Sequence, residues 1–363
     1  MQGMGGPQIV LAIIGIGVLI AWHELGHYTF ARLLGMRVLK YSVGFGPRLF
    51  GFRKGEIDYQ VAALPLGGFV QIKGMSSLEE GAKEDPRSFI NRPRWARFLV
   101  LGAGPGFNYA MAAVLYFSYL WVWPSPVDTA AIELGDVQPA TPAQAAGLLS
   151  GDFIVSVDGA TFDDLAGFKG AIGAQGGAQV TLRVLRGDET LSIPIVPLQR
   201  NGGYIIGISP NERLPRMDFA TTALNAGISC INETARTLSA FGALFRREPG
   251  VDVGSPVAIV ADMKDRIAKG ASFFIIILAM LSVNLGLLNL LPVPSLDGIK
   301  MLFLALEGLT RRDLNAKFQV YVNAAGLLAL LGLMVVLMGR DTLRLVNDDQ
   351  GGGEGAPPAS APP

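Results

Sequence analysis

The feature that most limits how this chain can fold is a set of long stretches without a charged residue. Residues 98–123, 270–296 and 318–339 contain no Asp, Glu, Lys or Arg. A helix of roughly 20 residues spans the hydrocarbon core of a bilayer, so each stretch predicts a membrane-spanning helix. Only 17% of the 363 residues are charged, against about a quarter in ordinary soluble domains. The chain is therefore expected to be a helical, multi-pass membrane protein.

A fourth apolar segment, residues 9–34, is apolar only as far as Trp22. It then carries four polar or charged side chains, those of His23, Glu24, His27 and Arg32. Residues 1–8 contain no Lys or Arg, and the apolar run ends in His-Glu rather than at a small-residue cleavage site. We therefore expect a retained span rather than a cleaved signal peptide, which gives about four transmembrane helices.

The charges between the spans predict an orientation. Residues 32–97 contain 12 basic and 6 acidic residues, and residues 300–317 are also basic. The positive-inside rule places both segments in the cytoplasm. The N-terminus, residues 124–269 and the C-terminus then lie outside, and Cys230, the single cysteine, has no partner for a disulfide. The net charge of zero argues against a nucleic-acid partner.

The loop between the first two spans is rich in glycine and in residues that favour strands. Residues 41–50, 57–62 and 67–73 form short alternating runs bounded by Gly and Pro, which predicts hairpin strands. Two interpretations stay open here. The strands could lie against the bilayer as a membrane-associated β-loop, or the segment could be an ordinary cytoplasmic loop.

The predicted outer segment contains a compact α+β domain. Residues 140–159 read ATPAQAAGLLSGDFIVSVDG, which resembles the signature of a PDZ domain, and strand-like runs recur up to residue 198. The resemblance implies that an extended peptide adds as a strand to an exposed sheet edge. We expect the groove-forming strand at residues 131–137, with Gly135 near the loop that receives the peptide.

These observations predict five regions along the chain. They are an N-terminal membrane domain (1–127), a PDZ domain (128–198), an outer helical linker (199–269), a C-terminal membrane domain (270–346) and a disordered tail (347–363). The tail is expected to be disordered because it is poor in apolar residues.

The clearest chemical signal is His23-Glu24-Leu25-Gly26-His27, an HExxH pattern. Residues four apart share one face of a helix, so both imidazoles can reach one zinc ion. Glu24 can then act as the general base on a water whose pKa zinc lowers to about 7.

The alternative is that the pattern arose by chance and that the histidines are ordinary core residues. Two facts favour a metal site. The chain has only two histidines, and both lie in this pattern. Ionisable residues within a membrane helix are also costly, by roughly 2.5–3.5 kcal/mol each, and are presumed functional.

A catalytic zinc needs a third protein ligand and an open fourth position. No further His is present, and Cys230 is predicted on the other side, so a carboxylate is expected. Asp297 is the first charge after the third span, where Pro292 and Pro294 must interrupt the helix. The alternative role for Asp297 is that of a helix cap only, and two rival carboxylates lie further along, Glu307 and Asp313.

Taken together, the motifs resemble the site-2 protease family over residues 10–338. The resemblance rests on HExxH in a first membrane helix, a PDZ insert and the run Asn289-x-x-Pro-x-Pro-x-Leu-Asp-Gly298. Further matches are GFGP at 44–47, GPGFN at 104–108 and SVNLG at 282–286. The bacterial branch of that family contains the sigma-E-activating intramembrane protease.

The resemblance implies zinc ligands at His23, His27 and Asp297, with Glu24 as the general base. It also implies a substrate-binding set consisting of Asn289, Pro292, Pro294, Gly44 and Gly46, since the β-loop of the family presents the substrate as an extended strand. Two departures stand out: Ile299 replaces a second glycine after Gly298, and one PDZ unit is present where the best-known bacterial member has two.

The predicted function is intramembrane zinc proteolysis in a bacterial cytoplasmic membrane, with the active site toward the cytoplasm. Expected partners are lipid, single-span membrane substrates and a peptide tail at the PDZ groove. An anti-sigma factor or leftover signal peptides, cut after a first protease, would suit such an enzyme. The alternatives are a membrane zinc transporter or sensor and an inactive PDZ-bearing scaffold.

Overall fold

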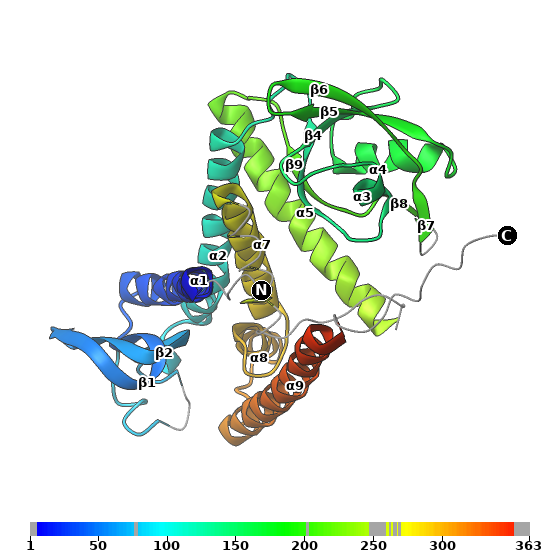
Figure 1. Ribbon diagram of the computed structural model, residues 1–363. Coiled ribbons are helices and arrows are strands. Elements are labelled where there is room, and N and C mark those ends of the chain that lie inside the picture. The colour runs from blue at the N-terminus through cyan, green and yellow to red at the C-terminus, as the bar shows by residue number, and fades with distance from the viewer. Residues whose placement is uncertain are drawn as a thin grey trace. The chain divides into compact units, whose positions relative to one another are not determined.

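The computed structural model describes residues 6–75, 79–200, 203–246, 259–260, 263, 267 and 270–351 (Figure 1). The chain divides into two compact units. The first comprises Met1–Asn108, Ala235–Asp265 and Asn284–Pro363, and the second comprises Tyr109–Thr234 and Arg266–Val283.

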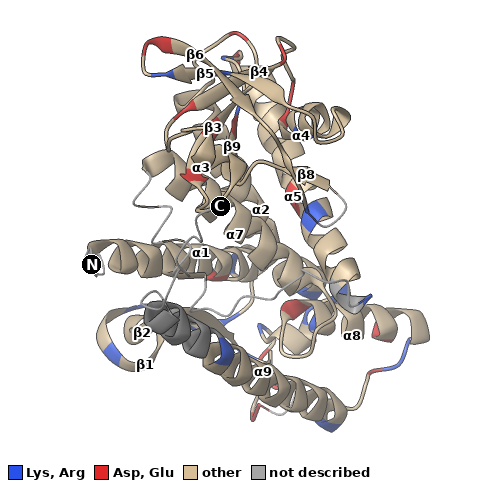
Figure 2. Cartoon of the chain, turned by 45° about the vertical axis from the view of Figure 1, so that its right-hand side comes forward, with Lys and Arg blue, Asp and Glu red and all other residues tan. Residues whose placement is uncertain are grey.

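Four of the helices in the described part of the chain are long and apolar enough to span a membrane. They are α1 (Gly6–Leu33), α2 (Arg94–Val122), α7 (Ala271–Leu290) and, within α9 (Ala316–Gly351), the segment Ala316–Arg340. Figure 2 shows α7 without a single blue or red residue. The number and positions of these helices match the four predicted spans.

The third apolar helix ends at Leu290, just before the two prolines that were predicted to interrupt it, since proline provides no amide hydrogen to extend a helix. One boundary differs from the sequence-based expectation. At the other end of the chain, residues 347–351 continue α9, although we expected them in a disordered tail. Residues 352–363 of that predicted tail lie outside the described residues.

The loop after α1 forms two long strands, β1 (Val38–Lys54) and β2 (Ile57–Ile72), as the glycine-punctuated pattern predicts (Figure 1). Each strand bends back on itself, so that two segments of the same strand lie in one sheet. Residues 40–43 lie opposite residues 68–71 and also opposite residues 58–61. The residues near 70 therefore form an outer row of this sheet, paired on one side only among the described residues.

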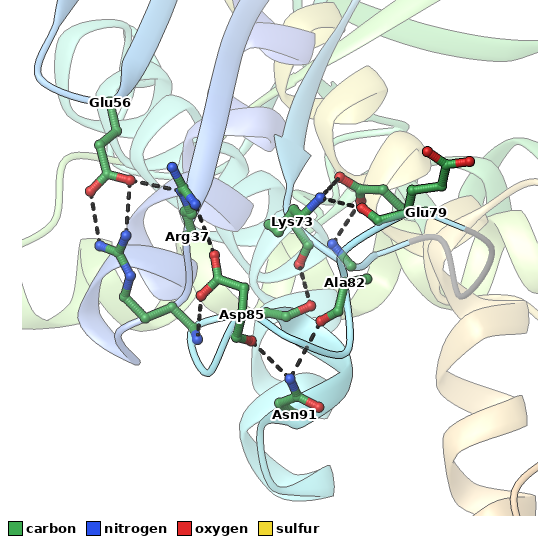
Figure 3. A network of polar contacts seen from close by, with 11 residues as sticks. Arg37, Glu56, Lys73, Glu79, Ala82, Asp85 and Asn91 are labelled. Carbon is green, nitrogen blue, oxygen red and sulfur yellow. Dashed lines mark hydrogen bonds and ion pairs between the residues drawn. The ribbon is translucent and has the colours of Figure 1, made fainter.

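A network of ion pairs fixes the base of this sheet to the segment that leads into α2 (Figure 3). Arg37 contacts Glu56 at 2.7 Å and Asp85 at 3.0 Å. Arg87 donates two hydrogen bonds of 2.9 Å to the Glu56 carboxylate. The short 3₁₀ helix η1 (Phe89–Asn91) precedes α2, and the Phe89 N–H donates to the Lys73 carbonyl at 2.7 Å, so the chain just after β2 is held close to the start of α2.

The second unit contains a five-stranded sheet in the order β6-β5-β4-β3-β9. Its strands are β3 (Ala131–Val137), β4 (Phe153–Val157), β5 (Val180–Arg186), β6 (Glu189–Ile195) and β9 (Ile208–Arg213). Two helices accompany it, α3 (Pro142–Ala145) and α4 (Leu165–Ala174) (Figure 1). Buried Val, Leu, Ile and Phe side chains from these strands and helices form one core, which makes the expected α+β domain.

The domain extends further along the chain than the predicted end at residue 198. The short strands β7 (Leu198–Arg200) and β8 (Gly203–Ile205) pair with each other, and β9 pairs with β3 along its whole length. The predicted helical linker therefore begins only after residue 213, with α5 (Phe219–Phe245). Most of its remainder, residues 247–269, lies outside the described residues.

The expected groove-forming strand at residues 131–137 is wrong in one respect. This strand, β3, bonds to β4 on one side and to β9 on the other. Gly135 is also covered, since its carbonyl oxygen accepts a hydrogen bond of 2.8 Å from Ser150. A strand with two bonded neighbours has no edge to offer a peptide, and the outermost strand on this side of the sheet is β9.

The ion-pair network predicts a pH dependence. Hydrogen bonds from Arg87 hold the pKa of Glu56 below its usual range, and those from Arg87 and Arg37 do the same for Asp85. A lowered folded-state pKa stabilises the fold above the unfolded value of about 4, and that stabilisation is lost as the pH falls through the folded pKa. We expect amide protection factors in residues 79–91 to drop between about pH 5 and pH 3, measured by hydrogen exchange.

The substitution Glu56→Gln should reduce the same protection already at pH 7. Glu84→Gln is the matched control, because Glu84 is an exposed carboxylate of the same loop for which no ion pair with a described residue is found. Protection in the unmodified protein that is equal at pH 3 and pH 6 would show that these ion pairs do not hold the loop.

Candidate metal centre

The two imidazoles of the HExxH pattern lie side by side on α1. His23 and His27 are both buried, and their Nε2 atoms are 3.1 Å apart. Residues four apart on a helix share one face, so the local backbone alone brings the two rings together. Neither ring points to solvent.

Asp297 reaches the same point from the far end of the sequence. The chain turns sharply between Leu290 and Asp297, and Asp297 is the first residue of α8 (Asp297–Thr310). Its Oδ2 lies 3.0 Å from His27 Nε2 and 3.3 Å from His23 Nε2. The turn is anchored by Ser295, whose backbone N–H and Oγ donate to Asn323 of α9 at 3.1 and 2.7 Å.

These three atoms have the spacing of metal ligands. The ligand atoms of His23, His27 and Asp297 all lie within 4.8 Å of one another, and the three side chains are buried. Tetrahedral ligands about 2.1 Å from one zinc ion are about 3.4 Å apart, close to the separations of 3.0–3.3 Å found here. Two imidazoles and one carboxylate are also a donor set that suits zinc. The residues fit the ion that the sequence predicts.

Helix α2 orients both imidazoles from behind. Nδ1 of His27 donates to the carbonyl oxygen of Val100 at 2.8 Å, so the Nε2 lone pair of a neutral ring faces Asp297. Nδ1 of His23 lies 3.0 Å from the Asn108 side-chain nitrogen, Nδ2. An acceptor such as the Val100 carbonyl fixes the ring orientation and tautomer of a metal-binding histidine, and Asn108 contributes to the position of the His23 ring.

Glycines allow these helices to approach closely. A Cβ atom on Gly104 of α2 would lie 2.7 Å from His23 Nε2 and would also collide with His27 Nε2. A Cβ atom on Gly26 of α1 would lie 2.8 Å from the carbonyl carbon of Ala103. Small residues let membrane helices pack backbone to backbone, and here they let α2 reach the rings of α1.

The three side chains open into a cavity of about 410 Å³. Glu24 lines this cavity beside His23 and His27, and Asn289 lines it from α7. Residues 67–70 and Ile72 of β2 form another part of the wall. The cavity therefore combines a candidate metal centre, a candidate base and the outer row of the sheet.

The sequence model of Peptidase family M50 matches residues 11–333 of this chain. The chain belongs to peptidase family M50. The expected membership of the site-2 protease family is thereby confirmed, while placement in its sigma-E branch stays a prediction.

This M50 peptidase is similar over most of its length to several bacterial proteins. It is 32% identical to a Clostridium perfringens protein over 92% of this chain and 98% of that protein. The corresponding values are 33%, 93% and 96% for a Nostoc protein, and 33%, 92% and 94% for a Synechocystis protein. All three bear the name "putative zinc metalloprotease".

Part of the chain also matches a solved PDZ domain, that of the SdrC-like protein of Listeria innocua. The sequence identity is 26%, and the match covers 22% of this chain and 93% of that structure. The TM-score is 0.21, and no conclusion rests on this likeness.

The predicted site residues of the M50 peptidase fall into three groups. His23, His27, Asp297, Glu24 and Asn289 meet at one cavity. Pro292 and Pro294 lie in the turn before α8, and Gly44 and Gly46 lie in β1 with φ angles of 92° and 88°; none of these four lines the cavity. Gly135 belongs to the other unit.

The two rival carboxylates have other roles. Oε1 of Glu307 accepts hydrogen bonds from the Leu314 amide at 3.1 Å and from Gln319 at 3.2 Å. Asp313 pairs with Arg94 at 3.2 Å. Neither belongs to the group that could hold the metal.

Several contributors were not predicted. Val100 acts through its backbone, which carries no sequence signal. Asn108 and Gly104 lie in the GPGFN match, but nothing local to that motif indicates that it faces the histidines. Lys300, whose Nζ lies 3.4 Å from Asp297 Oδ1, stands one helical turn after Asp297, a spacing that could have drawn attention to it.

We expect Asp297→Ala to lower zinc affinity by roughly 100-fold or more, since even outer partners of a ligand are worth 10–100-fold. The measurement is zinc bound per chain in competition with a chelator. Asp313→Ala, which removes an exposed carboxylate from the loop after the same helix, should leave zinc binding unchanged. Full zinc affinity in Asp297→Ala would show that another group is the third ligand.

We expect Gly104→Ala to reduce bound zinc to less than about half of the normal content, because the added methyl group displaces both imidazoles. Gly106→Ala is the matched control, since a Cβ atom there meets nothing within 4 Å. Zinc per purified chain, measured by mass spectrometry, decides the matter. Equal contents in the two variants would contradict the close packing of α2 against the rings.

Proposed function

We propose that this M50 peptidase is a zinc metalloprotease that hydrolyses peptide bonds within or near membrane-spanning segments of other proteins. The observation that carries the proposal is the buried group His23, His27 and Asp297, whose ligand atoms lie within 4.8 Å of one another. The names of the bacterial relatives support zinc as the metal. Two of the three ligands lie in α1, a helix apolar enough to span a bilayer, which favours a reaction at membrane depth.

The chemistry divides between the metal and the protein. When bound, zinc acts as a Lewis acid and makes water acidic enough to serve as a nucleophile near neutral pH. Glu24 lies one residue from His23 and lines the same cavity, so it can take the proton of the attacking water. The same carboxyl then delivers that proton to the leaving amine nitrogen.

The substrate backbone is expected to lie along residues 68–71, the outer row of the sheet that β1 and β2 form. Residues 68–71 pair with β1 on one side only, and they border the cavity that contains Glu24. An extended segment can add to such an edge through main-chain hydrogen bonds. Asn289 assists from α7. Its Nδ2 is held by the Leu285 carbonyl at 2.9 Å, which leaves its amide oxygen to accept a substrate N–H.

The α+β unit is expected to bind a peptide tail at β9 rather than at β3. Strand β9 ends the order of the five-stranded sheet. Its Glu212 accepts a hydrogen bond of 3.2 Å from the first residue of α4, Leu165. An open strand next to a helix is the arrangement that PDZ domains use for strand addition.

The distribution of basic residues between the spans suggests the orientation of the chain in a membrane. We propose a bacterial cytoplasmic membrane, with residues 32–97 and 300–317 inside because of their excess of basic residues. The α+β unit then lies outside. Substrates would be single-span proteins already trimmed by a first protease, such as an anti-sigma factor or a leftover signal peptide.

We expect Glu24→Gln to lower the cleavage rate by about 10²–10⁴-fold, because the amide cannot accept a proton. Zinc content should stay normal, since Glu24 is not among the ligands. The assay is a tagged single-span substrate without its outer domain, co-expressed with either form and scored by a gel shift. Equal cleavage by the two forms would remove Glu24 from the mechanism, and would leave only transport or scaffolding consistent with a zinc site.

A further inference from the structure

A second cavity, of about 490 Å³, lies in the first unit and has no role in the chemistry described above. Its walls combine apolar side chains, among them Phe89 and Phe303, with three cationic ones, those of Lys83, Arg97 and Lys300. The volume is typical of ligand-binding cavities, which span about 300–1,000 Å³. Cations set in apolar walls indicate a ligand with a negative end.

This second cavity is a neighbour of the catalytic one. Met75 and Lys300 line both cavities. Lys300 is the one Lys or Arg among the residues that line the catalytic cavity, and its Nζ lies 3.4 Å from Oδ1 of Asp297. A positively charged side chain is therefore shared by the two cavities, one helical turn from the metal ligand.

The other two cations are available for an anion. Among the described residues, neither Lys83 nor Arg97 forms an ion pair, and the Arg97 Nε–H is buried without a hydrogen-bond partner. A buried donor without a partner is unfavourable, and that cost is recovered when a ligand accepts the hydrogen bond.

The carboxylates in the same wall cancel only part of this charge. Asp313 is exposed and is paired with Arg94, which does not line the cavity. Glu307 keeps its negative charge, because its hydrogen-bond donors, the Leu314 amide and Gln319, are neutral. Even with Lys300 counted as paired with Asp297, Lys83 and Arg97 outnumber Glu307, so the net charge of the cavity is positive.

The reaction itself produces a matching anion. Hydrolysis breaks the C–N bond of the peptide, adds the hydroxyl of water to the carbonyl carbon and gives the hydrogen to the amine nitrogen. The acyl fragment thereby gains a terminal carboxylate that the substrate lacked. That new charge arises next to the metal site, in the cavity whose wall shares Lys300 with the second one.

We propose that the second cavity is a product pocket, which binds the acyl fragment of the cleaved substrate through its newly formed carboxylate. This inference rests on the proposed proteolytic function. Lys300 attracts the carboxylate from the shared wall, Arg97 and Lys83 hold it beyond, and the apolar walls accept the side chains that precede it. The wall shared with the catalytic cavity favours a peptide product over a lipid head group, which would not need to bind beside the metal site.

The test compares two product peptides. The cleavage site is first located by mass spectrometry with the unmodified enzyme, and the acyl-side peptide is then synthesised with a free carboxylate or with a terminal amide. Inhibition constants for both are measured in nanodiscs with the trimmed single-span substrate. We expect the carboxylate form to inhibit the unmodified enzyme at least tenfold more strongly than the amide.

In Arg97→Gln and in Lys83→Gln, we expect the preference for the carboxylate peptide over the amide peptide, measured as the ratio of their inhibition constants, to fall by about tenfold. The loss of one charge-assisted hydrogen bond changes a binding constant by about this factor. Lys83 lies on an exposed loop, so its variant should fold even if the Arg97 variant does not. Lys317→Gln, an exposed lysine outside both cavities, should keep the ratio of the unmodified enzyme.

A ratio unchanged in both variants would overturn the proposal, because the metal alone would then account for the preference for the carboxylate. Variants that lose activity only in nanodiscs containing phosphatidylglycerol, with the ratio unchanged, would overturn it in favour of a lipid head group. Failure of the proteolytic function itself is distinguished beforehand, since it appears as no cleavage by the unmodified enzyme or as cleavage by Glu24→Gln.

Discussion

The contact between one carboxylate oxygen and two imidazole nitrogens determines how the first unit is built. Oδ2 of Asp297 lies 3.0 Å from His27 and 3.3 Å from His23, although about 270 residues separate the two ends. Polar groups buried in apolar surroundings are tolerated when they satisfy one another or hold a metal. The break after Leu290, the anchoring of the turn by Asn323 and the close approach of α2 all serve to hold this contact in place.

Much of this unit could be predicted because its signals are local. A run of apolar residues defines a membrane helix by its length, and the spacing of His23 and His27 defines a shared helix face. Asp297 could be chosen because two prolines mark the one break in a later apolar helix. Glycines bounding alternating runs likewise predicted β1 and β2, which confirms that turn chemistry is readable without tertiary information.

The rest depends on contacts between distant segments. Val100 orients His27 through its backbone carbonyl. Every residue has such a carbonyl, so the amino-acid sequence cannot indicate that this one binds the imidazole. Strand β9 completes the sheet by pairing with β3, yet its sequence is polar and contains a proline, which is the pattern of a loop. The misplaced peptide groove has the same origin, because which strand lies at a sheet edge is decided by pairing and not by local pattern.

The doubled pairing of β1 has a consequence for which bonds the enzyme cuts. Residues 40–43 occupy the inner side of the residue 68–71 row, so only main-chain groups on its outer side remain for a substrate. Every amino acid except proline offers the same main-chain donor and acceptor. A substrate helix, however, must give up its internal hydrogen bonds before it can use them. If the substrate binds along this row as proposed, selectivity depends on helix stability: segments rich in Gly or β-branched residues, which leave the helix at low cost, would be cleaved ahead of Leu- and Ala-rich ones.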